Sequence, residues 1–430
     1  MIDIRLIREN PELVKENMKK KFQHEKLIFV DKLKKLDDDW KKIKFNEEKL
    51  RSERNKISKE INSVKKSKDN KKAEALIKKA KEIPDKIAKL ELKRKKLESE
   101  IWTLQTEIPN ILSKNVPIGK DDSENVEERK IGEPKKFDFP VKNHVEIIDN
   151  LGLADFDSSA RVAGTGFYYL EGDLALLNAA LLNYARDIMV SKGFKYVETP
   201  LLLREEIIDQ VTDLNDKKQQ IYIVDDNPPL ALIGTSEHSL IGRYAGQEIP
   251  ENKLPIKQTS YSMCFRKEIG AHGVDEKGLY RTHQFNKIEM VVICNPDIKE
   301  SEKFFKEMQN ISIEIFKGLE IPIRVLKICS GDIGDLKYEQ VDIEAWSPRR
   351  NAYFEVGSCS NLTGAQARKL NISTRIKGQR QMPHTLNNTA LASSRALVSI
   401  IENNQQSDGS VKIPKVLWNY MSGKKKIEKI

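Results

Sequence analysis

Apolar residues recur at alternating steps of four and three positions along the first quarter of the chain. The pattern is interrupted at residues 65–72, where the stretch KKSKDNKK holds no apolar side chain. A heptad sustained over four or more repeats is typical of a coiled coil, so we predict two long antiparallel helices joined at that tip. The apolar positions are Phe29, Leu33, Leu36, Trp40, Ile43, Leu50, Ile57, Ile61 and Val64, then Ala73, Leu76, Ala80, Ile83, Ile87, Leu90, Leu97, Ile101, Leu104 and Ile108.

Polar residues occupy three positions that the heptad reserves for apolar ones, namely Glu47, Arg54 and Arg94. Polar core positions in coiled coils usually control register at some cost in stability. Pro84 lies within the second helix and is expected to kink or interrupt it. Each helix of roughly 35 residues would be about 50 Å long, which is more than a compact core requires. We therefore interpret residues 1–112 as an arm.

The pattern changes after this arm. Residues 113–140 are rich in proline, glycine and charge, and we expect a linker there. Residues 141–430 then mix short alternating segments with helical ones, which indicates an α+β domain built on an antiparallel sheet flanked by helices. The expected strands are residues 287–294, 323–329, 340–346 and 352–360, and the expected helices are residues 176–194, 302–319 and 390–403.

One stretch of the second part is unusually charged for its place between two strand-like segments. MCFRKEIGAHGVDEKGLYRTHQFNKIEM (residues 263–290) carries nine Lys, Arg, Asp and Glu residues and two histidines, between LPIKQTSYS and VVIC. A solvated hairpin loop is the simplest interpretation of such a stretch. No P-loop and no GxGxxG motif is present, so a nucleotide site would have to bind the phosphates with another arrangement of residues.

Length and charge support two parts with different roles. A chain of 430 residues favours two domains. The formal net charge is +10, yet residues 1–110 hold 32 basic and 21 acidic residues, so the first quarter has a net charge of +11 and the remainder −1. A basic elongated segment on a neutral body favours a polyanionic partner such as RNA. A structural spacer or a merely soluble charged helix remains the alternative.

Cysteine usage and hydropathy indicate the compartment. Cys264, Cys294, Cys329 and Cys359 are widely spaced and form no CxxC pair, which favours reduced structural thiols over a zinc knuckle or a redox motif. No apolar run of about 18 residues occurs, and the charged N-terminus lacks the apolar region of a secretory signal. We expect a cytoplasmic protein with no membrane segment.

Five stretches resemble, in order, the motifs of one enzyme family. GFKYVETP (193–200), FRKE with GLYRTHQFNKIE (265–289) and HTLNNTALASSR (384–395) are similar to motifs 1, 2 and 3 of class II aminoacyl-tRNA synthetases. GTSEH (234–238) and FEVGSCSNLTGAQARK (354–369) resemble seryl-tRNA synthetases in particular. The N-terminal LIRENPELVKENMKKK and the helical arm match that family too, so the resemblance covers essentially the whole chain.

The resemblance implies an ATP-dependent serine–tRNA ligase. Such an enzyme activates L-serine to seryl-adenylate and transfers the seryl group to tRNA(Ser), with tRNA(Sec) a further candidate. The charged stretch would then be a hairpin that binds ATP. The catalytic residues implied are Arg266, Glu268 and Arg395. ATP would contact Arg266, Lys267, Glu268, Thr282, Phe285, Glu355, Val356, Gly357, Ser358 and Arg395, with Glu355 and Ser358 binding Mg²⁺.

The resemblance also implies a serine site, in which hydrogen bonds rather than shape select so small a substrate. Glu289 would read the side-chain hydroxyl, and Thr235 and Glu237 would hold the ammonium group. The full set of serine positions is Thr235, Ser236, Glu237, Arg266, Glu289, Asn387 and Thr389. Without the family frame, Phe285 could equally be a core residue, and Arg266 and Glu268 neighbouring sheet charges.

The family implies partners as well. Its arm holds tRNA(Ser) by shape, and its motif 1 forms the interface of a homodimer. We expect no zinc, because the zinc-dependent version of the enzyme has a different N-terminal domain, and we interpret His238, His272, His283 and His384 as packing or hydrogen-bonding residues. Two alternatives stay open, a synthetase-like paralogue that loads a carrier protein and a non-catalytic RNA-binding scaffold.

Overall fold

The structure is a computed structural model that describes residues 1–66, 69–212, 217, 219–268 and 278–429, without the side chains of residues 72 and 73. The chain forms two compact units, Met1–Pro109 and Asn110–Ile430. Part of the predicted helical tip, residues 67–68, lies outside this description, as do the side chain of Ala73 and residues 269–277 of the charged hairpin.

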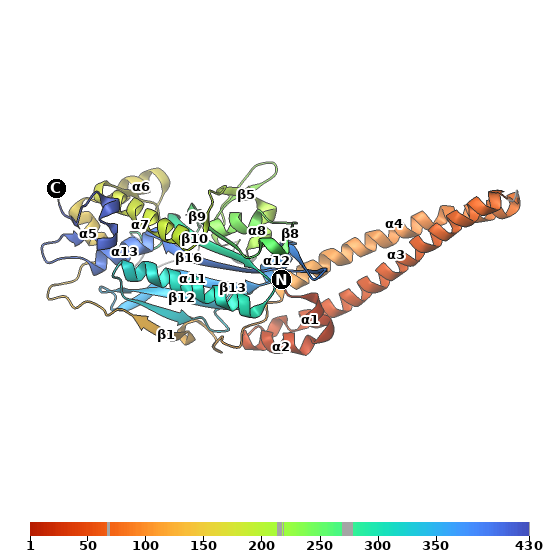
Figure 1. The fold of residues 1–430 in the computed structure, drawn as a ribbon, viewed down its shortest axis with the longest axis horizontal. Helices are drawn as coiled ribbons and strands as arrows, with labels where there is room; N and C mark the ends of the chain where they lie inside the picture. The colour runs from red at the N-terminus through yellow and green to blue at the C-terminus, as the bar shows by residue number, and fades with distance from the viewer. Residues whose placement is uncertain (67–68, 213–216, 218, 269–277, 430) are drawn as a thin grey trace. The chain divides into compact units, whose positions relative to one another are not determined.

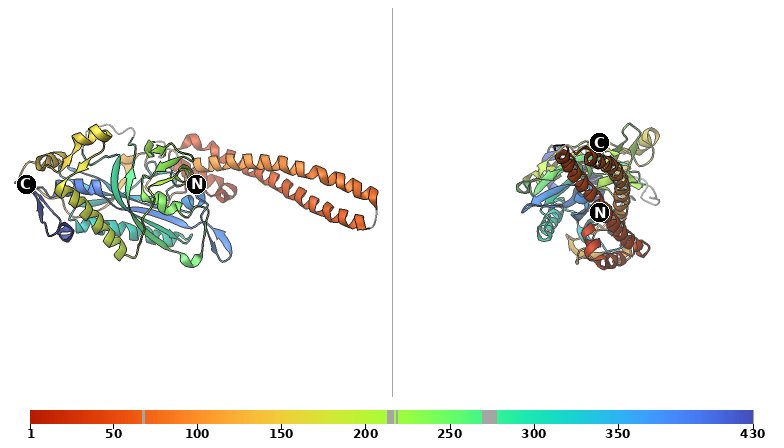
Figure 2. Two further views of the ribbon diagram at one scale, coloured as in Figure 1. Left: turned by 90° about the horizontal axis from the view of Figure 1, so that it is seen from above. Right: turned by 90° about the vertical axis from the view of Figure 1, so that its right-hand side faces the viewer.

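The first unit is a helical hairpin. Its two long helices, α3 (Ile28–Lys66) and α4 (Asn70–Glu107), pack along each other (Figure 1 and the left view of Figure 2), which confirms the predicted antiparallel pair. Helix α4 runs through Pro84 without interruption, so the proline does not break it. Three short helices precede the pair: α1 (Ile4–Glu9), α2 (Pro11–Lys20) and the 3₁₀ helix η1 (His24–Lys26).

Two of the polar heptad positions meet across the hairpin. Glu47 of α3 is buried and accepts a hydrogen bond from Arg94 Nε of α4 at 2.9 Å, while Arg94 also contacts Glu98 at 2.6 Å. The Trp40 indole donates to the same Glu98 at 3.0 Å. Since each charged group in this cluster has an opposite partner, the pair tolerates burial and resists a shift of one helix along the other. Arg54, in the third polar position, is exposed.

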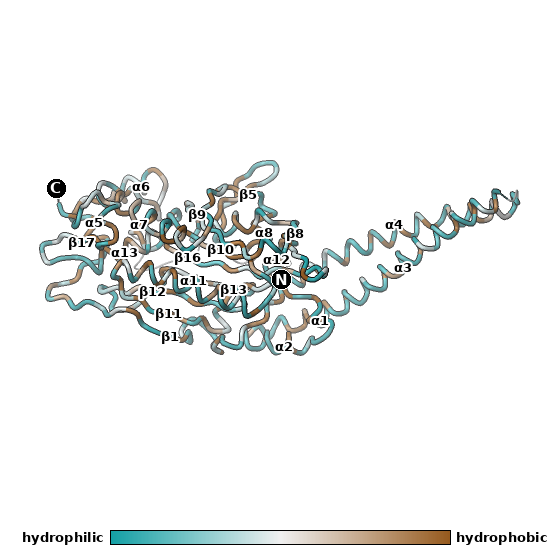
Figure 3. Tube along the Cα trace, viewed as in Figure 1, coloured by the Kyte–Doolittle hydropathy of each residue, from teal (hydrophilic) through white to brown (hydrophobic). Residues whose placement is uncertain are grey.

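Figure 3 shows the hydrophilic character of α3 and α4, with apolar residues recurring along each. Those apolar residues form a narrow core around Ile57, Ile83 and Ile87. A narrow core of this kind stabilises a helix pair without giving it the thickness of a globular domain.

The second unit is built on an eight-stranded sheet with the order β1-β11-β12-β13-β16-β10-β9-β4. All neighbouring strands are antiparallel except the parallel pair β4–β9, so the predicted α+β class is confirmed. The strands are β1 (Val126–Ile131), β4 (Lys195–Tyr196), β9 (Ile256–Phe265), β10 (Gln284–Cys294), β11 (Ile323–Lys327), β12 (Glu339–Ser347), β13 (Ala352–Thr363) and β16 (His384–Ala392).

Alternation along β10 assigns the two faces of the sheet. Ile288, Met290 and Val292 belong to the main core, to which α7 (Gly172–Ser191), α11 (Ile298–Gly318) and α13 (Ser393–Asn403) contribute. Val291 and Ile293 belong instead to a second cluster with α8 (Glu205–Val211), α10 (Ser236–Gly242) and α12 (Ala365–Lys369). Because successive side chains point to opposite faces, helices cover the sheet on both sides. Figure 1 shows α11 lying along β13 and β16.

Smaller elements complete this unit. They are η2 (Asp122–Glu124), α5 (His144–Leu151), β2 (Ala154–Asp155), α6 (Phe156–Ala163), β3 (Tyr169–Leu170), β5 (Leu202–Arg204), β6 (Ile223–Val224), β7 (Leu230–Leu232), β8 (Glu248–Ile249), η3 (Glu251–Lys253), β14 (Ser373–Ile376), β15 (Gln379–Gln381), β17 (Val411–Lys412), η4 (Lys415–Leu417), η5 (Asn419–Met421) and β18 (Lys426–Ile427). Among the described residues, no helix is both long and apolar enough to cross a membrane.

Two sequence expectations differ from the structure. Residues 113–140, expected as a linker, include β1, which pairs with β11 at the edge of the sheet and so belongs to the second unit. The helix expected at residues 390–403 begins only at Ser393, because residues 390–392 complete strand β16. In both cases backbone pairing with a distant strand decides the conformation, and local composition does not reveal that partner. All four cysteines are free and buried.

The buried ion pair of the hairpin generates a prediction about register. In a double-mutant cycle with Glu47→Ala and Arg94→Ala, we expect a coupling of about 1 kcal/mol, because both groups are partly removed from water. The coupling energy is measured by hydrogen exchange of the α3 and α4 amides in the full chain. The more exposed pair Glu53–Lys79, with a 2.9 Å contact, is the matched control and should show little coupling. Equal coupling in the two cycles would contradict the assigned role.

Candidate active site

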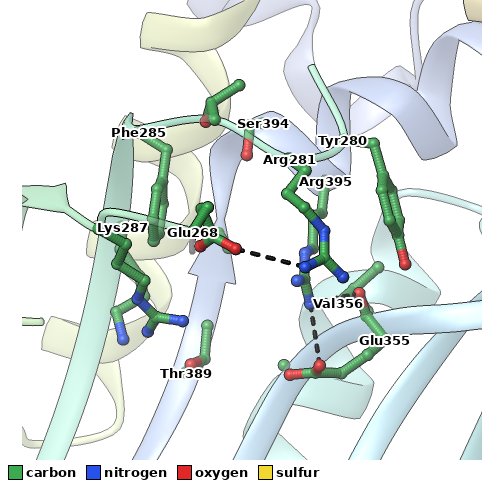
Figure 4. A pocket seen from close by; sticks show the side chains of 14 residues that line it. Glu268, Tyr280, Arg281, Phe285, Lys287, Glu355, Val356, Thr389, Ser394 and Arg395 are labelled. Carbon is green, nitrogen blue, oxygen red and sulfur yellow. Dashed lines mark hydrogen bonds and ion pairs between the residues drawn. The ribbon is translucent and has the colours of Figure 1, made fainter. Parts of the chain in front are cut away.

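One pocket gathers charged and aromatic side chains from four strands of the sheet and the start of α13 (Figure 4). The strands are β9 and β10 with the segments that follow and precede them, β13 and β16. The lining residues are Arg266, Glu268, Tyr280, Arg281, Thr282, Phe285, Lys287, Glu355, Val356, Gly357, Thr389, Ala392, Ser394 and Arg395. The charged hairpin predicted to bind a ligand therefore contributes one wall, through its described residues.

Successive side chains of a strand point to opposite faces, so alternate residues of β10 point toward this pocket. Phe285, Lys287 and Glu289 alternate with core residues and share the face opposite α7 and α11. Glu289 pairs in register with Thr389 of β16. Directly opposed residues of antiparallel strands point to the same face, so β16 adds its polar side chains to the same wall.

Arg266 is held where β9 ends and the hairpin begins. Its Nε donates to the Gly234 carbonyl at 3.3 Å, and its guanidinium lies 5.3 Å from the centre of the Phe285 ring. The backbone N–H of Arg266 donates to the His283 carbonyl, which closes the β9–β10 pair. A guanidinium stacked on an aromatic face keeps its outer N–H groups available for a planar anion such as a carboxylate or a phosphate.

Glu268 and Arg281 face each other from the two limbs of the hairpin, with 3.5 Å between Glu268 Oε2 and Arg281 Nη1 (Figure 4). Glu268 has a φ of +47°, a left-handed conformation that non-glycine residues seldom adopt. Such conformations persist when the surrounding structure imposes them, and they are frequent at functional sites. The hairpin thus aims this carboxylate into the pocket at a cost to the local backbone.

Arg395, at the start of α13, forms the far wall. Its Nη1 contacts both the Glu355 carboxylate, at 3.1 Å, and the Glu355 carbonyl, at 2.9 Å. Burial disfavours the charged form of Glu355, but the positive charge of Arg395 outweighs that effect and lowers the pKa of this carboxyl group. The Tyr280 ring lies 5.4 Å from the Arg395 guanidinium. This corner therefore holds a charged pair at neutral pH.

A β-bulge brings Glu355 and Ser358 to the same face of β13. Ser358 pairs with Asp342 and Glu355 with Glu344, so one extra residue separates them on β13. Asp342 accepts a hydrogen bond from Gln340, which also donates to Ser358. Burial, with the nearby charge of Glu355, raises the pKa of Asp342 to about 7. Three oxygen donors, two carboxyl groups and a hydroxyl, therefore cluster here, a set that suits Mg²⁺.

A second group of polar side chains adjoins the pocket at the start of α10. Glu237 Oε1 accepts hydrogen bonds from Gln366 at 2.8 Å and from Asn387 at 2.9 Å. Burial, together with the charge of Glu289, raises the pKa of Glu237 to about 7. Lys287 pairs with Glu289 and also lines the pocket, so the two groups are contiguous.

Thr235 caps the N-terminus of α10, its hydroxyl accepting from the Glu237 N–H at 3.3 Å. Ser236 is fully buried beside it. The whole group is therefore a buried acidic site with amide and hydroxyl neighbours, able to bind a small cation that carries a hydroxyl.

The structure brings most of the sequence-predicted residues together, in two places. Nine of them line the pocket: Arg266, Glu268, Thr282, Phe285, Glu355, Val356, Gly357, Thr389 and Arg395. Six other predicted residues do not line the pocket, and they belong to the adjoining group or lie behind the pocket: Thr235, Ser236, Glu237, Glu289, Asn387 and Ser358. Lys267 differs, because its Nζ lies 5.9 Å from the Tyr222 ring and it does not line the pocket.

Several lining residues were not predicted, namely Tyr280, Arg281, Lys287, Ala392 and Ser394. Lys287 could have been found, since it stands between Phe285 and Glu289 in a strand of period two. Asp342 carried no sequence signal, because only the register of β12 with β13 brings it beside Ser358.

The histidines near these motifs are packed or hydrogen-bonded where the structure describes them. His238 is buried, and burial lowers its pKa to about 3. His283 Nδ1 lies 2.9 Å from the Arg266 carbonyl, and His384 Nδ1 lies 3.1 Å from Ser301 Oγ. His272 lies outside the described residues. Within the described part of the chain, no group of three or more His, Cys, Asp or Glu side chains could hold a metal ion.

Comparisons with known proteins agree on one family. The family described as "Seryl-tRNA synthetase N-terminal domain" matches residues 1–112, and "tRNA synthetase class II core domain (G, H, P, S and T)" matches residues 220–404. A serine–tRNA ligase of Methanospirillum hungatei is 46% identical over 320 residues, which are 74% of this chain and 75% of that protein.

Solved structures are similar along the whole chain. The seryl-tRNA synthetase of Pyrococcus horikoshii, complexed with ATP, is 39% identical with a TM-score of 0.92, and the match covers 100% of both chains. The cytoplasmic serine–tRNA ligase of Naegleria fowleri, in complex with AMP, is 33% identical with a TM-score of 0.88, covering 99% of this chain and 98% of that one.

The buried Glu237 generates a prediction about stability and pH. Its pKa in the folded chain, about 7, lies above the usual 4.5, so the unfolded chain releases the proton at lower pH. The protonated Glu237 side chain therefore contributes stability to the folded chain that is fully present below pH 4.5 and is lost as the pH rises through 7. Glu237→Gln should therefore gain up to about 3 kcal/mol on the wild type between pH 4.5 and 8.

Chemical unfolding of both proteins across this pH range measures the difference. The exposed Glu206→Gln variant is the control, because its carboxyl group lies on the surface and its difference from wild type should not change with pH. A constant difference for Glu237→Gln would show that this carboxyl group ionises normally.

Proposed function

The chain belongs to the seryl-tRNA synthetase family, and we propose that the pocket and its adjoining acidic group are the ATP and serine sites of a serine–tRNA ligase. The observation that carries this assignment is the contiguity of an arginine-lined pocket with a buried carboxylate cluster, joined through Lys287. One site favours anionic phosphates and the other favours a cationic amine. An amino acid presents both its ammonium and its carboxylate, so it can lie between the two.

The first step needs positioning more than a base. The serine carboxylate attacks the α-phosphorus of ATP; an oxygen–phosphorus bond forms and the bond to the pyrophosphate leaving group breaks. A carboxylate is already a nucleophile at pH 7, so the protein contributes charge neutralisation and orientation. We propose that Arg266 contacts the reacting carboxylate and the α-phosphate, and that adenine stacks on the Phe285 ring. Glu268 and Thr282 would make further contacts with the nucleotide. Val356 and Gly357 border the site through their backbone.

The outer phosphates would meet the far wall. Arg395 supplies a cation at the γ-phosphate, since its guanidinium is fixed by Glu355 and always charged. Glu355 and Ser358 offer oxygen ligands to Mg²⁺, which when bound neutralises phosphate charge. The donor set fits such an ion, with Asp342 as a third oxygen donor in hydrogen-bond contact with Gln340.

Serine selection would rest on the acidic group. The substrate ammonium compensates the buried charge of Glu237, with Thr235 and Asn387 beside it. Glu289 accepts from the serine hydroxyl, and Thr389, opposite Glu289 in the sheet, supplies a further hydroxyl. A site that hydrogen-bonds a substrate hydroxyl rejects an amino acid lacking it, because a buried polar group is then left without a partner.

The helical unit would hold the second substrate. Its excess of positive charge lies along two exposed helices. Such a distribution attracts RNA phosphates, and the helices would recognise the shape of the RNA rather than its bases. The 3′-terminal hydroxyl of tRNA(Ser) then attacks the seryl carbonyl of the adenylate, and AMP leaves. We further propose a homodimer working in the cytoplasm, the compartment that its free buried cysteines favour.

Substrate specificity in ATP–pyrophosphate exchange tests this function first. We expect exchange with serine and at least 10²-fold less with alanine or glycine, which lack the hydroxyl, and less with the larger threonine. Arg266→Ala should reduce exchange by 10²-fold or more, since it loses contact with both reacting groups. The exposed Arg129→Ala, on the edge strand β1, is the control and should exchange normally.

Absence of exchange with any amino acid would favour the non-catalytic scaffold. Exchange with serine but transfer to a carrier protein instead of tRNA would favour the paralogue.

The arm generates a separate prediction. Lys89, Lys93 and Lys96 are exposed on one face of α4, at steps of four and three. Replacing all three with Gln should raise the KM for tRNA(Ser) about tenfold and reduce its salt dependence, because phosphate contacts are lost. Serine-dependent pyrophosphate exchange should not change. The same assay with tRNA(Sec) tests the further substrate.

A matched control is Lys299, Lys303 and Lys306, exposed on α11 at the same spacing. If the α11 triple variant weakens tRNA charging as much as the α4 variant, the effect comes from overall charge and not from the arm.

A further inference from the structure

We propose that His144, on a helix outside all the family motifs, is a positioning residue for the ATP pocket. It would act by anchoring the returning limb of the β9–β10 hairpin at Leu279. The proposal rests on the assignment of the pocket to ATP. His144 begins α5 and is buried beside α13. Figure 1 shows α5 and α13 as neighbours at one end of the second unit.

The anchor begins with a single hydrogen bond to the hairpin. The Leu279 N–H donates to His144 Nε2 at 3.2 Å. Leu279 is fully buried, so its N–H has no access to water and needs a protein acceptor. Since Nε2 must accept, the ring proton of the neutral imidazole is on Nδ1, which faces Glu402 Oε1 at 3.3 Å.

Close packing supports the same contact. Gly278 has a φ of +105°, and a β-carbon there would lie 2.3 Å from His144 Nε2 and 2.7 Å from Val145 Cγ2. Only a glycine therefore lets the backbone approach the imidazole so closely. The hydrogen bond and the glycine contact are separate observations that locate the same backbone segment against the same ring.

Glu402 connects this ring to the turn between β12 and β13. Its Oε1 also accepts from the backbone N–H of His144, at 3.2 Å, and its Oε2 accepts from the Ser347 hydroxyl. Ser347 in turn accepts from the Arg350 N–H at 3.3 Å. Burial disfavours an ionised Glu402, but the hydrogen bonds from His144 and Ser347 outweigh it and lower its pKa. Glu402 is thus a fixed acceptor between helix α13 and the β12–β13 turn.

The contacts of His144 and Glu402 influence the position of the three residues that follow Leu279. Tyr280, Arg281 and Thr282 all line the pocket. The Arg350 guanidinium lies 4.2 Å from the Tyr280 ring centre, so the network holds this ring from two sides, through the backbone and over its face. The His144–Glu402 pair therefore determines where this limb of the hairpin meets a nucleotide, although neither residue lines the pocket.

Two substitutions separate the anchor from simple packing. In His144→Asn, the side-chain amide replaces the Nδ1–H group toward Glu402 but leaves no acceptor for Leu279. In His144→Gln, the longer side chain extends to the Nε2 position, where its oxygen can accept. We expect His144→Asn to raise the KM for ATP in pyrophosphate exchange about tenfold with little change in the KM for serine, and His144→Gln to stay within about twofold of the wild type.

Hydrogen exchange of the Leu279–Thr282 amides gives a readout that does not depend on catalysis. These amides should exchange faster in His144→Asn and remain protected in His144→Gln. Gly278→Ala approaches the contact from the other side and should reproduce the effects of His144→Asn. It serves as the second variant if His144→Asn folds poorly.

Equal behaviour of the Asn and Gln variants, either both normal or both impaired, would overturn the anchoring role. A failure of the proposed function looks different, because the wild type itself would then show no serine-dependent exchange while the Leu279 amide still distinguished the two variants.

Discussion

The backbone pairing of β10 with β9 on one side and β16 on the other is the constraint on which the site depends. It sets Glu289 opposite Thr389 and carries Phe285 and Lys287 on the same face, so that these side chains form a row on one surface of the sheet. A slip of one residue would turn this row toward the main core and move Met290 and Val292 to the opposite face. The large apolar area buried by α7 and α11 therefore enforces the register of the polar site.

The site holds charge where burial disfavours it. Glu237 and Asp342 both have pKa values raised to about 7, whereas Glu355 remains ionised because Arg395 lies 3.1 Å away. Burial of such groups costs free energy, and carboxyl groups with perturbed pKa values are frequent at functional sites. In the function proposed above, the ammonium group of the substrate would supply a countercharge at Glu237.

The helical hairpin uses buried charge differently. Glu47, Arg94 and Glu98 satisfy one another within the unit and need no ligand. Many lysines of α3 and α4 lie on exposed faces, where in the proposed function they would attract a polyanion. Charged residues of the same types therefore pair with one another in the helical unit, whereas in the pocket we assign them to substrates.

Local patterns in the sequence predicted the main helices, the central strands and the charged character of the site. Heptad periodicity predicted the two long helices, and the alternation of residues predicted the central strands and the antiparallel class, because both signals are local. The motifs predicted most residues of the site. Long-range packing was needed to bring together strands and residues that are distant in sequence. It placed residues 126–131 in the sheet as β1, extended β16 to Ala392, and used a bulge to bring Glu355 and Ser358 to one face. It also set Asp342 beside Ser358, and His144 against Leu279 across 135 positions of the chain. Such pairs leave no periodic trace in the sequence, since their partners are chosen by long-range packing and register, which no local window contains.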